Sequence, residues 1–210
     1  GFLKLGIPEA QIHTIYNGTE FITESGEEEA TTEPYSVHDE LGIPHNAEII
    51  GIFGHVNDFK GHPLLVSAMR EIVAVRPNAY LMCVGPADPA FKQSLCDTAT
   101  ASGVLDHIRF TGTRNDVKRL LGATTVIALP SCYEACSMAI IEAMSMGKPV
   151  VVTHAGGNPE LVTDFKTGRL IERNASAVAE GLLSLLNEPA LCKKMGENAQ
   201  QEARERFSAK

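Results

Sequence analysis

Two short apolar segments with a helical stretch between them limit the folds open to this chain more than any other feature of its sequence. Residues 125–129 and 149–153 are mostly apolar, which is typical of strands buried inside a sheet. Residues 136–146 between them predict a helix that ends at Gly147, a left-handed stop, with Lys148 near its negative end. Nearly every face of this helix is apolar, so we expect it to be buried.

Two glutamates mark this region as a candidate site. Glu142 interrupts the apolar helix, and Glu134 lies eight residues before it, in the loop that leads to the helix. An ionised carboxylate in apolar surroundings costs several kcal/mol unless another group pairs with it. The loop and the helix N-terminus predict an anion site, through the helix dipole and free N–H groups. The spacing leaves a structural alternative equally open, in which Glu142 pairs with a lysine or caps a neighbouring helix and Glu134 is solvated.

Strands and helices alternate along the chain from Glu48 onward. Further apolar runs predict strands at 49–54, 80–85, 108–112 and 169–171. Apolar residues at helical spacing predict helices at 63–75, 89–101, 115–122, 176–187 and 189–206, with a short helix near 159–162. This alternation predicts an α/β fold, a doubly wound parallel sheet with helices on both faces. Ligands bind such sheets at the carboxyl ends of the strands. We therefore expect one shared rim for the loops after Phe53, Val84, Phe110, Leu129 and Val152.

The first 47 residues have a different character. Residues 1–19 predict the end of a helix, a stop and a short strand at 12–16. The sequence Leu-Gly-Ile-Pro occurs at 5–8 and again at 41–44, which we interpret as the same helix-stop chemistry used twice. Residues 20–40 are acidic and poor in apolar side chains, which favours a solvated excursion. We therefore interpret residues 1–47 as an interdomain connection and 48–210 as a Rossmann-like domain with C-terminal helices.

The composition excludes several classes of function. The chain has 210 residues and a formal net charge of −8, which argues against nucleic acid or an anionic membrane as its main partner. Its five cysteines show no Cys-x-x-Cys spacing and are interpreted as reduced thiols. No signal peptide or membrane-length apolar run is present. We expect a cytoplasmic protein without a transmembrane segment.

Three loops of the expected rim carry residues suited to a phosphorylated ligand. Lys60, followed by Gly61, would place a cation over a phosphate; the alternative is a solvated surface lysine. Gly85 allows the close backbone approach of a ligand or simply forms a tight turn. Thr113 and Arg114 would offer backbone groups to a nucleobase and a guanidinium for stacking. A plain turn at the start of a helix explains this third loop equally well.

Other motifs are uninformative or absent. Residues 155–160 form a glycine turn into a helix with Pro159 in its first turn, and structural requirements explain much of this pattern. His154 is interpreted as packed or solvated rather than catalytic. The sequence contains no P-loop, no Gly-x-Gly-x-x-Gly after a predicted strand, no Asp-x-Asp pair, no metal-spaced His/Cys cluster and no Gly-x-Ser-x-Gly elbow. Metal catalysis and serine hydrolysis therefore have no support.

Taken together, these loops resemble the C-terminal, donor-binding domain of retaining GT-B glycosyltransferases of group 1, or family 4. The resemblance extends from the first Leu-Gly-Ile-Pro to the last predicted helix. Each motif alone is weak, but their common order is specific. The motifs are Asn17-Gly18, Lys60-Gly61, Gly85, Phe110-x-Gly112, Pro130-Ser131, Glu134-x7-Glu142, Gly147-Lys148-Pro149-Val150, Gly156-Gly157-x-Pro159-Glu160 and Thr167-Gly168.

The resemblance implies a site that grips a nucleotide-sugar donor. In it, Glu142 holds the ribose hydroxyls and Glu134 a hydroxyl of the donor sugar, while Lys60 meets the diphosphate. We therefore predict Glu134 and Lys60 as catalytic residues. The resemblance assigns the remaining donor contacts to the N–H groups around Cys136, Ser137 and Met138, to Thr113 and Arg114 near the base, and to Gly54, His55 and Gly85. The chemistry agrees, because carboxylates suit hydroxyl groups and a lysine suits a diphosphate, so no metal or further cofactor is expected.

The sequence departs from the family pattern in three ways. Many relatives have an arginine where this chain has His55, which puts the second phosphate-binding cation in doubt. Ala135 and Ser137 replace glycines that are common around the first glutamate, which would tighten the sugar pocket. The N-terminal acceptor domain of a GT-B enzyme has no counterpart in these 210 residues, so we expect a fragment that is inactive alone.

Two other interpretations remain open. The chain could be a non-catalytic module that binds a nucleotide sugar, or a domain of a related GT-B epimerase or phosphorylase. The sequence identifies neither the base and sugar of the donor nor the acceptor.

Overall fold

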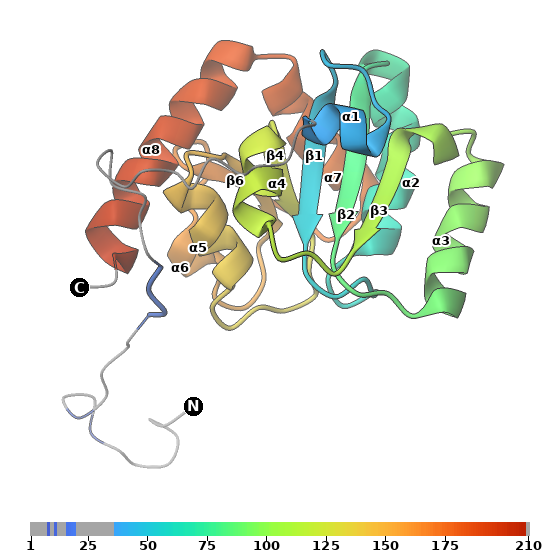
Figure 1. The fold of residues 1–210 in the computed structure, drawn as a ribbon. Helices are drawn as coiled ribbons and strands as arrows, with labels where there is room; N and C mark the ends of the chain where they lie inside the picture. Colours follow the sequence, from blue (N-terminus) through green and yellow to red (C-terminus); the bar gives the residue numbers. More distant parts are fainter. Residues whose placement is uncertain (1–7, 9–10, 12–15, 20–35, 209–210) are drawn as a thin grey trace.

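The computed structural model describes residues 8, 11, 16–19 and 36–208. Within them the chain forms one parallel β-sheet with helices on both faces (Figure 1). Residues 12–15 of the strand expected at 12–16, and most of the acidic excursion at 20–40, lie outside the described residues.

The sheet has six strands, which pair in parallel in the order β3-β2-β1-β4-β5-β6. Their bounds are β1 Glu48–Phe53, β2 Ala79–Val84, β3 Ile108–Gly112, β4 Val126–Leu129, β5 Val150–Thr153 and β6 Gly168–Ile171. β2 and then β3 are added on one side of β1. The chain then crosses to the other side of β1, where β4, β5 and β6 are added in turn. The switch point between β1 and β4 is where doubly wound sheets bind ligands. The predicted α/β, doubly wound parallel sheet is confirmed.

Helices cover the sheet in two layers. α2 and α7 pack against each other on one face with α3 beside α2, while α4 and α5 lie on the other (Figure 1). α8 packs against both α5 and α7. The bounds are α2 His62–Val75, α3 Pro89–Ala101, α4 Val117–Ala123, α5 Met138–Ser145, α6 Asn158–Leu161, α7 Ala175–Leu186 and α8 Pro189–Phe207. These helices agree with the predicted ones to within about two residues at each end.

The position of the strands in the core explains why their sequences are continuous apolar runs. Ile49, Ile50 and Ile52 of β1 are fully buried, because side chains on both faces of a central parallel strand meet a layer of helices. α5 is buried on most of its surface, as predicted, but it is shorter than the predicted 136–146. Ser137 has extended backbone angles as its N-cap, and Gly147 has a φ of +69°, which confirms the left-handed stop.

A short helix that was not predicted precedes the sheet. α1, Val37–Leu41, begins at Ser36, whose hydroxyl accepts a hydrogen bond from the Asp39 N–H while the Asp39 carboxylate accepts one from the Ser36 N–H. This Ser-x-x-Asp capping box was visible in the sequence, within the stretch interpreted as a solvated excursion. The helix ends at Gly42, with a φ of +60°, so the Leu-Gly-Ile-Pro stop at 41–44 is confirmed. A 3₁₀ turn at Leu105–His107 was also not predicted.

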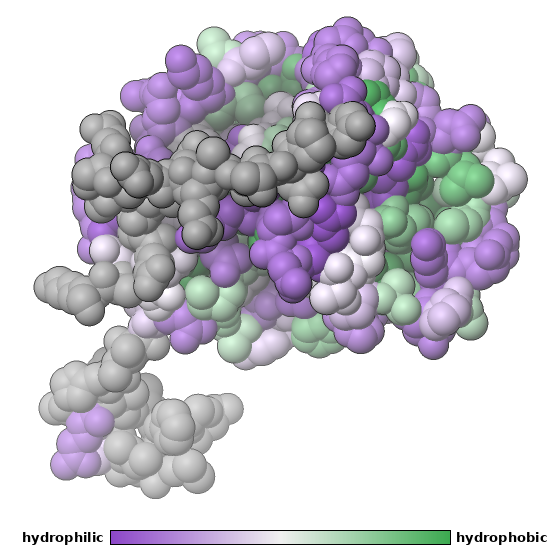
Figure 2. Space-filling view, in the orientation of Figure 1, coloured by the Kyte–Doolittle hydropathy of each residue, from purple (hydrophilic) through white to green (hydrophobic). Residues whose placement is uncertain are grey.

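No helix among the described residues is long and apolar enough to cross a membrane. On the face in Figure 2, hydrophilic and hydrophobic residues are interspersed, and the hydrophobic ones form separate small patches.

Candidate functional site

Glycines bring the loops at the carboxyl ends of the strands into contact. A Cβ atom on Gly85, after β2, would lie 2.0 Å from the carbonyl oxygen of Gly54, after β1. A Cβ atom on Gly61 would lie 2.2 Å from the carbonyl oxygen of Pro130, after β4. Any side chain at Gly85 or Gly61 would force these loops apart. In this structure the close neighbour of Gly85 is therefore the backbone of another loop.

The centre of this rim is an ion pair between two loops. The Lys60 ammonium, after β1, lies 2.7 Å from Oε1 of Glu134, after β4. The hydroxyl of Ser131 donates a second hydrogen bond, of 2.8 Å, to the same oxygen. Glu134 is only 8% exposed. The structural alternatives, in which Glu134 and Lys60 are separately solvated, are therefore wrong.

The glycine turn after β5 holds the backbone of the same glutamate. Gly157 donates a 2.6 Å hydrogen bond from its N–H to the carbonyl of Glu134. Gly156 has a φ of +57°, and a Cβ atom there would lie 2.1 Å from that carbonyl oxygen. The sequence pattern was explained mainly as a turn that precedes a helix. Two adjacent glycines were the available signal that another backbone approaches closely.

Glu142 lies one helical turn inside α5 and is half-buried. Burial raises the pKa of its carboxyl, and the charge of Lys118 partly offsets this effect. No described residue forms a hydrogen bond or an ion pair with the carboxylate of Glu142. Neither the lysine pair nor the helix-capping role of the structural alternative is thus present among the described residues. The carboxylate is available to a donor from a ligand.

The N-terminus of α5 lies between Glu134 and Glu142 in the sequence. Cys136 and Ser137 precede the first helical residue, Met138. The N–H groups of Met138, Ala139 and Ile140 have no acceptor among the described residues, as is usual for the first turn of a helix. They carry the positive end of the helix dipole, so this turn is suited to an anion.

Arg114, in the loop after β3, is already held by carboxylates. Its Nε and Nη2 atoms each donate a 2.8 Å hydrogen bond to Asp116, and its Nη1 atom contacts Glu40 of α1. Arg119 of α4 forms ion pairs with both Glu40 and Asp116. These guanidinium groups lower the pKa of Asp116 to about 2. The in-plane edges of Arg114 are therefore occupied, and its flat faces are the part left for stacking on a base. The neighbouring Thr113 is exposed.

Two histidines follow β1, His55 in the loop and His62 at the start of α2. His55 is exposed, next to Gly54. His62, at the start of α2, is fully buried, and its Nδ1 atom lies 3.1 Å from the carbonyl oxygen of Asn57. Its Nε2 atom has no hydrogen-bond partner among the described residues. Burial lowers the pKa of His62 to about 4, so the side chain is neutral at pH 7. Sequence reasoning singled out neither His62 nor the role of Ser131.

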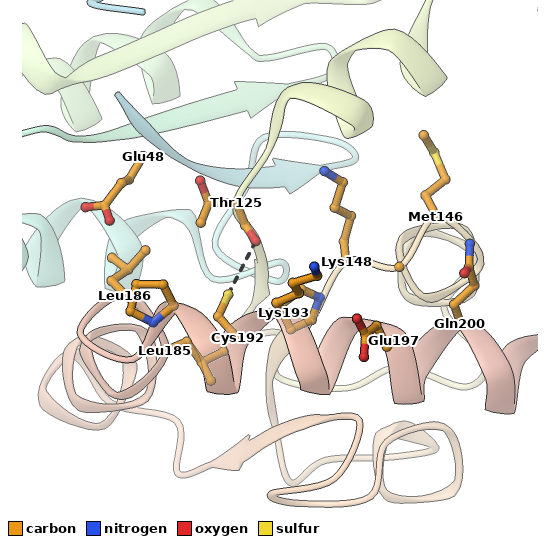
Figure 3. A pocket seen from close by; sticks show the side chains of 13 residues that line it. Glu48, Thr125, Met146, Lys148, Leu185, Leu186, Cys192, Lys193, Glu197 and Gln200 are labelled. Atoms are coloured by element: carbon orange, nitrogen blue, oxygen red, sulfur yellow. Dashed lines mark hydrogen bonds between the residues drawn. The ribbon is translucent and has the colours of Figure 1, made fainter. Parts of the chain in front are cut away.

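A pocket of about 420 Å³ lies at the other end of the sheet, where β1, β4 and β5 begin (Figure 3). The ammonium of Lys148 at its edge donates to the carbonyls of Gly122 and Thr124, at the end of α4. Lys148 therefore serves the C-terminus of α4 rather than that of α5. In the part of the chain that the structure describes, no three His, Cys, Asp or Glu side chains are arranged to hold a metal ion.

The sheet and its rim define a class: a Rossmann-like α/β protein with a lysine–glutamate pair and a helix N-terminus at its switch point. The family model of the glycosyl transferases group 1 matches residues 36–202. The chain belongs to this family, which confirms the resemblance stated from its motifs.

Individual relatives agree with this membership. The D-inositol 3-phosphate glycosyltransferase of Corynebacterium efficiens is 32% identical over 172 residues, which are 79% of this chain and 41% of the relative. The alpha-maltose-1-phosphate synthase of Mycolicibacterium smegmatis is 28% identical, over 94% of this chain and 53% of the relative. The chain thus spans about half the length of the curated relatives it matches.

Solved structures show the same fold. HepE of Anabaena in complex with UDP superposes with a TM-score of 0.85 at 26% identity, over 99% of this chain and 56% of HepE. HepE in complex with UDP and glucose gives a TM-score of 0.77 at 28% identity, over 81% of this chain and 47% of HepE. The fold is that of the Rossmann-like half of GT-B glycosyltransferases.

Proposed function

We propose that this chain is the donor-binding part of a glycosyltransferase that moves a sugar from a nucleotide sugar to an acceptor with retention of configuration. One observation carries the proposal: Lys60 and Glu134 form a partly buried ion pair. Beside it lie the first N–H groups of α5 and the carboxylate of Glu142, which have no partner among the described residues. This set offers a cation and a helix N-terminus to a diphosphate, and two carboxylates to hydroxyl groups.

The assignment of residues follows the chemistry of each part of the donor. Lys60 and the N-terminus of α5 stabilise the diphosphate, which leaves as a nucleoside diphosphate when the sugar is transferred. Glu134 accepts from a hydroxyl of the sugar, and Glu142 accepts from the ribose. The flat face of Arg114 stacks on the base. With these cations and amides in place, the bond to the leaving group breaks without a metal ion.

The proposal extends to the longer protein. The acceptor would bind in a cleft between this chain and a second Rossmann-like half, in line with the greater length of the relatives. The described cysteines are all free, which supports a reducing, cytoplasmic location.

Calorimetry tests the binding part of the proposal. The 210-residue chain is titrated with UDP-, GDP- and ADP-sugars and with the corresponding nucleoside diphosphates. We expect one nucleotide series to bind with a Kd of tens of micromolar or weaker, about −6 kcal/mol. The absence of binding by all three series would contradict the proposal.

A further inference from the structure

We propose that Ser131 is a positioning residue for the sugar-binding glutamate. Its hydroxyl fixes Glu134 through Oε1 and leaves Oε2 to accept from a hydroxyl group of the donor sugar. The inference rests on the proposed function, because it refines the role of Glu134 in the same site.

The two oxygens of Glu134 have different surroundings. Oε1 accepts from the Ser131 hydroxyl at 2.8 Å and from the Lys60 ammonium at 2.7 Å. No described residue donates to Oε2. A carboxylate oxygen accepts about two hydrogen bonds, so Oε1 is saturated while Oε2 retains its full capacity. The carboxylate is therefore anchored on one side and open to a ligand donor on the other.

Ser131 is itself fixed by the neighbouring strand. It is fully buried, and its carbonyl accepts a 2.6 Å hydrogen bond from the hydroxyl of Thr153 at the end of β5. The carbonyl of Thr153 in turn accepts a 2.9 Å hydrogen bond from the Asn158 side chain. Thr153 and Asn158 are also buried. This chain of hydrogen bonds joins the loop after β4 to the loop after β5 and holds the Ser131 hydroxyl in place.

Ser131 and Lys60 hold the same oxygen in different ways. Lysine has a flexible side chain with four rotatable bonds, and in the proposed function its charge is shared with the diphosphate. Serine has a single side-chain torsion before its hydroxyl and carries no charge that a diphosphate could attract. When a diphosphate draws the ammonium of Lys60, Ser131 is the donor that keeps the Glu134 carboxylate oriented. Its loss should therefore weaken sugar recognition without weakening recognition of the diphosphate.

A purely structural role makes a different prediction. If Ser131 only satisfied a buried carboxylate, its removal would destabilise the rim and lower the affinity for every ligand of the site. The ratio of the affinities for a nucleotide sugar and for its nucleoside diphosphate separates the two roles, because a general loss of structure leaves this ratio unchanged.

Calorimetry of the 210-residue chain with UDP and UDP-glucose tests the inference, with GDP and GDP-mannose as a second pair of probes. We expect Ser131→Ala to lower the affinity for the nucleotide sugar about tenfold and to leave that for the diphosphate within about twofold. Ser131→Cys, similar in size but a weak donor, should have the same selective effect. The matched control is Ser184→Ala on α7, whose hydroxyl donates to the Gly181 carbonyl away from the rim; both affinities should stay as in the parent.

Circular dichroism accompanies each variant, and Ser131→Cys is decisive if Ser131→Ala does not fold. If the parent binds both members of a pair and the Ser131 variants retain its affinity ratio, the inference is overturned while the proposed function stands. If the parent binds neither of these pairs nor ADP and ADP-glucose, the proposed function fails and the inference fails with it.

Discussion

The ammonium of Lys60 lies 2.7 Å from Oε1 of Glu134, although the two residues are 74 positions apart in the chain. The sequence assigned them to different parts of a ligand, the diphosphate and the sugar. Their direct pairing means that each neutralises the other before a donor arrives, so the stability of the rim and its affinity for a donor are coupled.

The first prediction concerns the stability that this ion pair provides. Lys60→Met should lower the free energy of unfolding by about 1–3 kcal/mol, between the values for exposed and buried pairs, because it leaves Glu134 buried without its cation. Urea denaturation measures the change. The control is Lys166→Met, which removes an exposed lysine 3.6 Å from Glu202 and should cost less than about 0.5 kcal/mol. Equal effects of the two substitutions would show that the Lys60–Glu134 pair is no stronger than a surface pair.

The second prediction is that Glu142 lowers the stability of the fold but increases the affinity for the nucleotide. Its carboxyl has a raised pKa in the folded chain, so the charged form is destabilising above that pKa and the penalty disappears as the pH falls through it. Glu142→Gln should therefore raise the Tm of the ligand-free chain at pH 7. The same substitution should weaken nucleotide affinity by about 1–3 kcal/mol, through loss of a charged acceptor.

Two comparisons sharpen this test of Glu142. The loss of affinity should be larger for the ribonucleotide than for its 2′-deoxy analogue if the carboxylate binds the ribose. Glu71→Gln on α2, an exposed position, should change neither Tm nor affinity. A lower Tm for Glu142→Gln would indicate an ion pair that stabilises the fold.

The third prediction is a loss of stability in mild acid that arises from His62. Because its pKa is lowered to about 4 in the folded chain, His62 takes up a proton more readily in the unfolded chain between pH 6.5 and 4. Stability is full above about pH 6.5 and falls as the pH drops through that window, by about 2 kcal/mol at pH 5. His62→Leu should remove this part of the loss, as measured by urea denaturation at pH 7 and pH 5. If His62→Leu loses as much free energy of unfolding between pH 7 and pH 5 as the parent, another group causes the acid sensitivity.

The fourth prediction concerns the exposed cation of the first loop. His55→Arg should leave the affinity for a nucleoside diphosphate unchanged or increase it, because the substitution supplies a permanent positive charge in the loop proposed to face the diphosphate. The affinity for the free nucleoside should not change, which provides an internal control. A clear loss of diphosphate binding, measured by calorimetry, would show that the imidazole of His55 has a role of its own.

The fifth prediction is that the 210-residue chain binds its donor without metal and does not transfer the sugar. Most of the rate of glycosyl transfer comes from holding donor and acceptor together and stabilising developing charge, and in the proposed function this chain supplies the donor side. Calorimetry with and without EDTA should give the same Kd, and a nucleotide-release assay should give no turnover. Robust transfer, or binding abolished by EDTA, would sink the proposal.

The sequence by itself determined the sheet, most of the helices and the family. Continuous apolar runs such as 149–153 predict strands buried on both faces, because the physical cause is local: burial on both sides removes the alternation of polar and apolar residues. The left-handed stops at Gly42 and Gly147 could also be predicted, since a positive φ depends on the residue itself. The capping box of Ser36 and Asp39 indicates α1, whereas the acidic composition around it favours a solvated excursion; the structure follows the capping box.

Only the tertiary structure decided which side chains meet at the rim. The pairing of Lys60 with Glu134, the hydroxyl of Ser131 on the same oxygen and the Gly156–Gly157 turn under the glutamate join loops after β1, β4 and β5. Local sequence carries no signal for such pairs, because a parallel sheet brings together the ends of strands that are distant along the chain. The sequence thus determined which residues stand at the ends of the strands, and the order of the strands decided how they are combined.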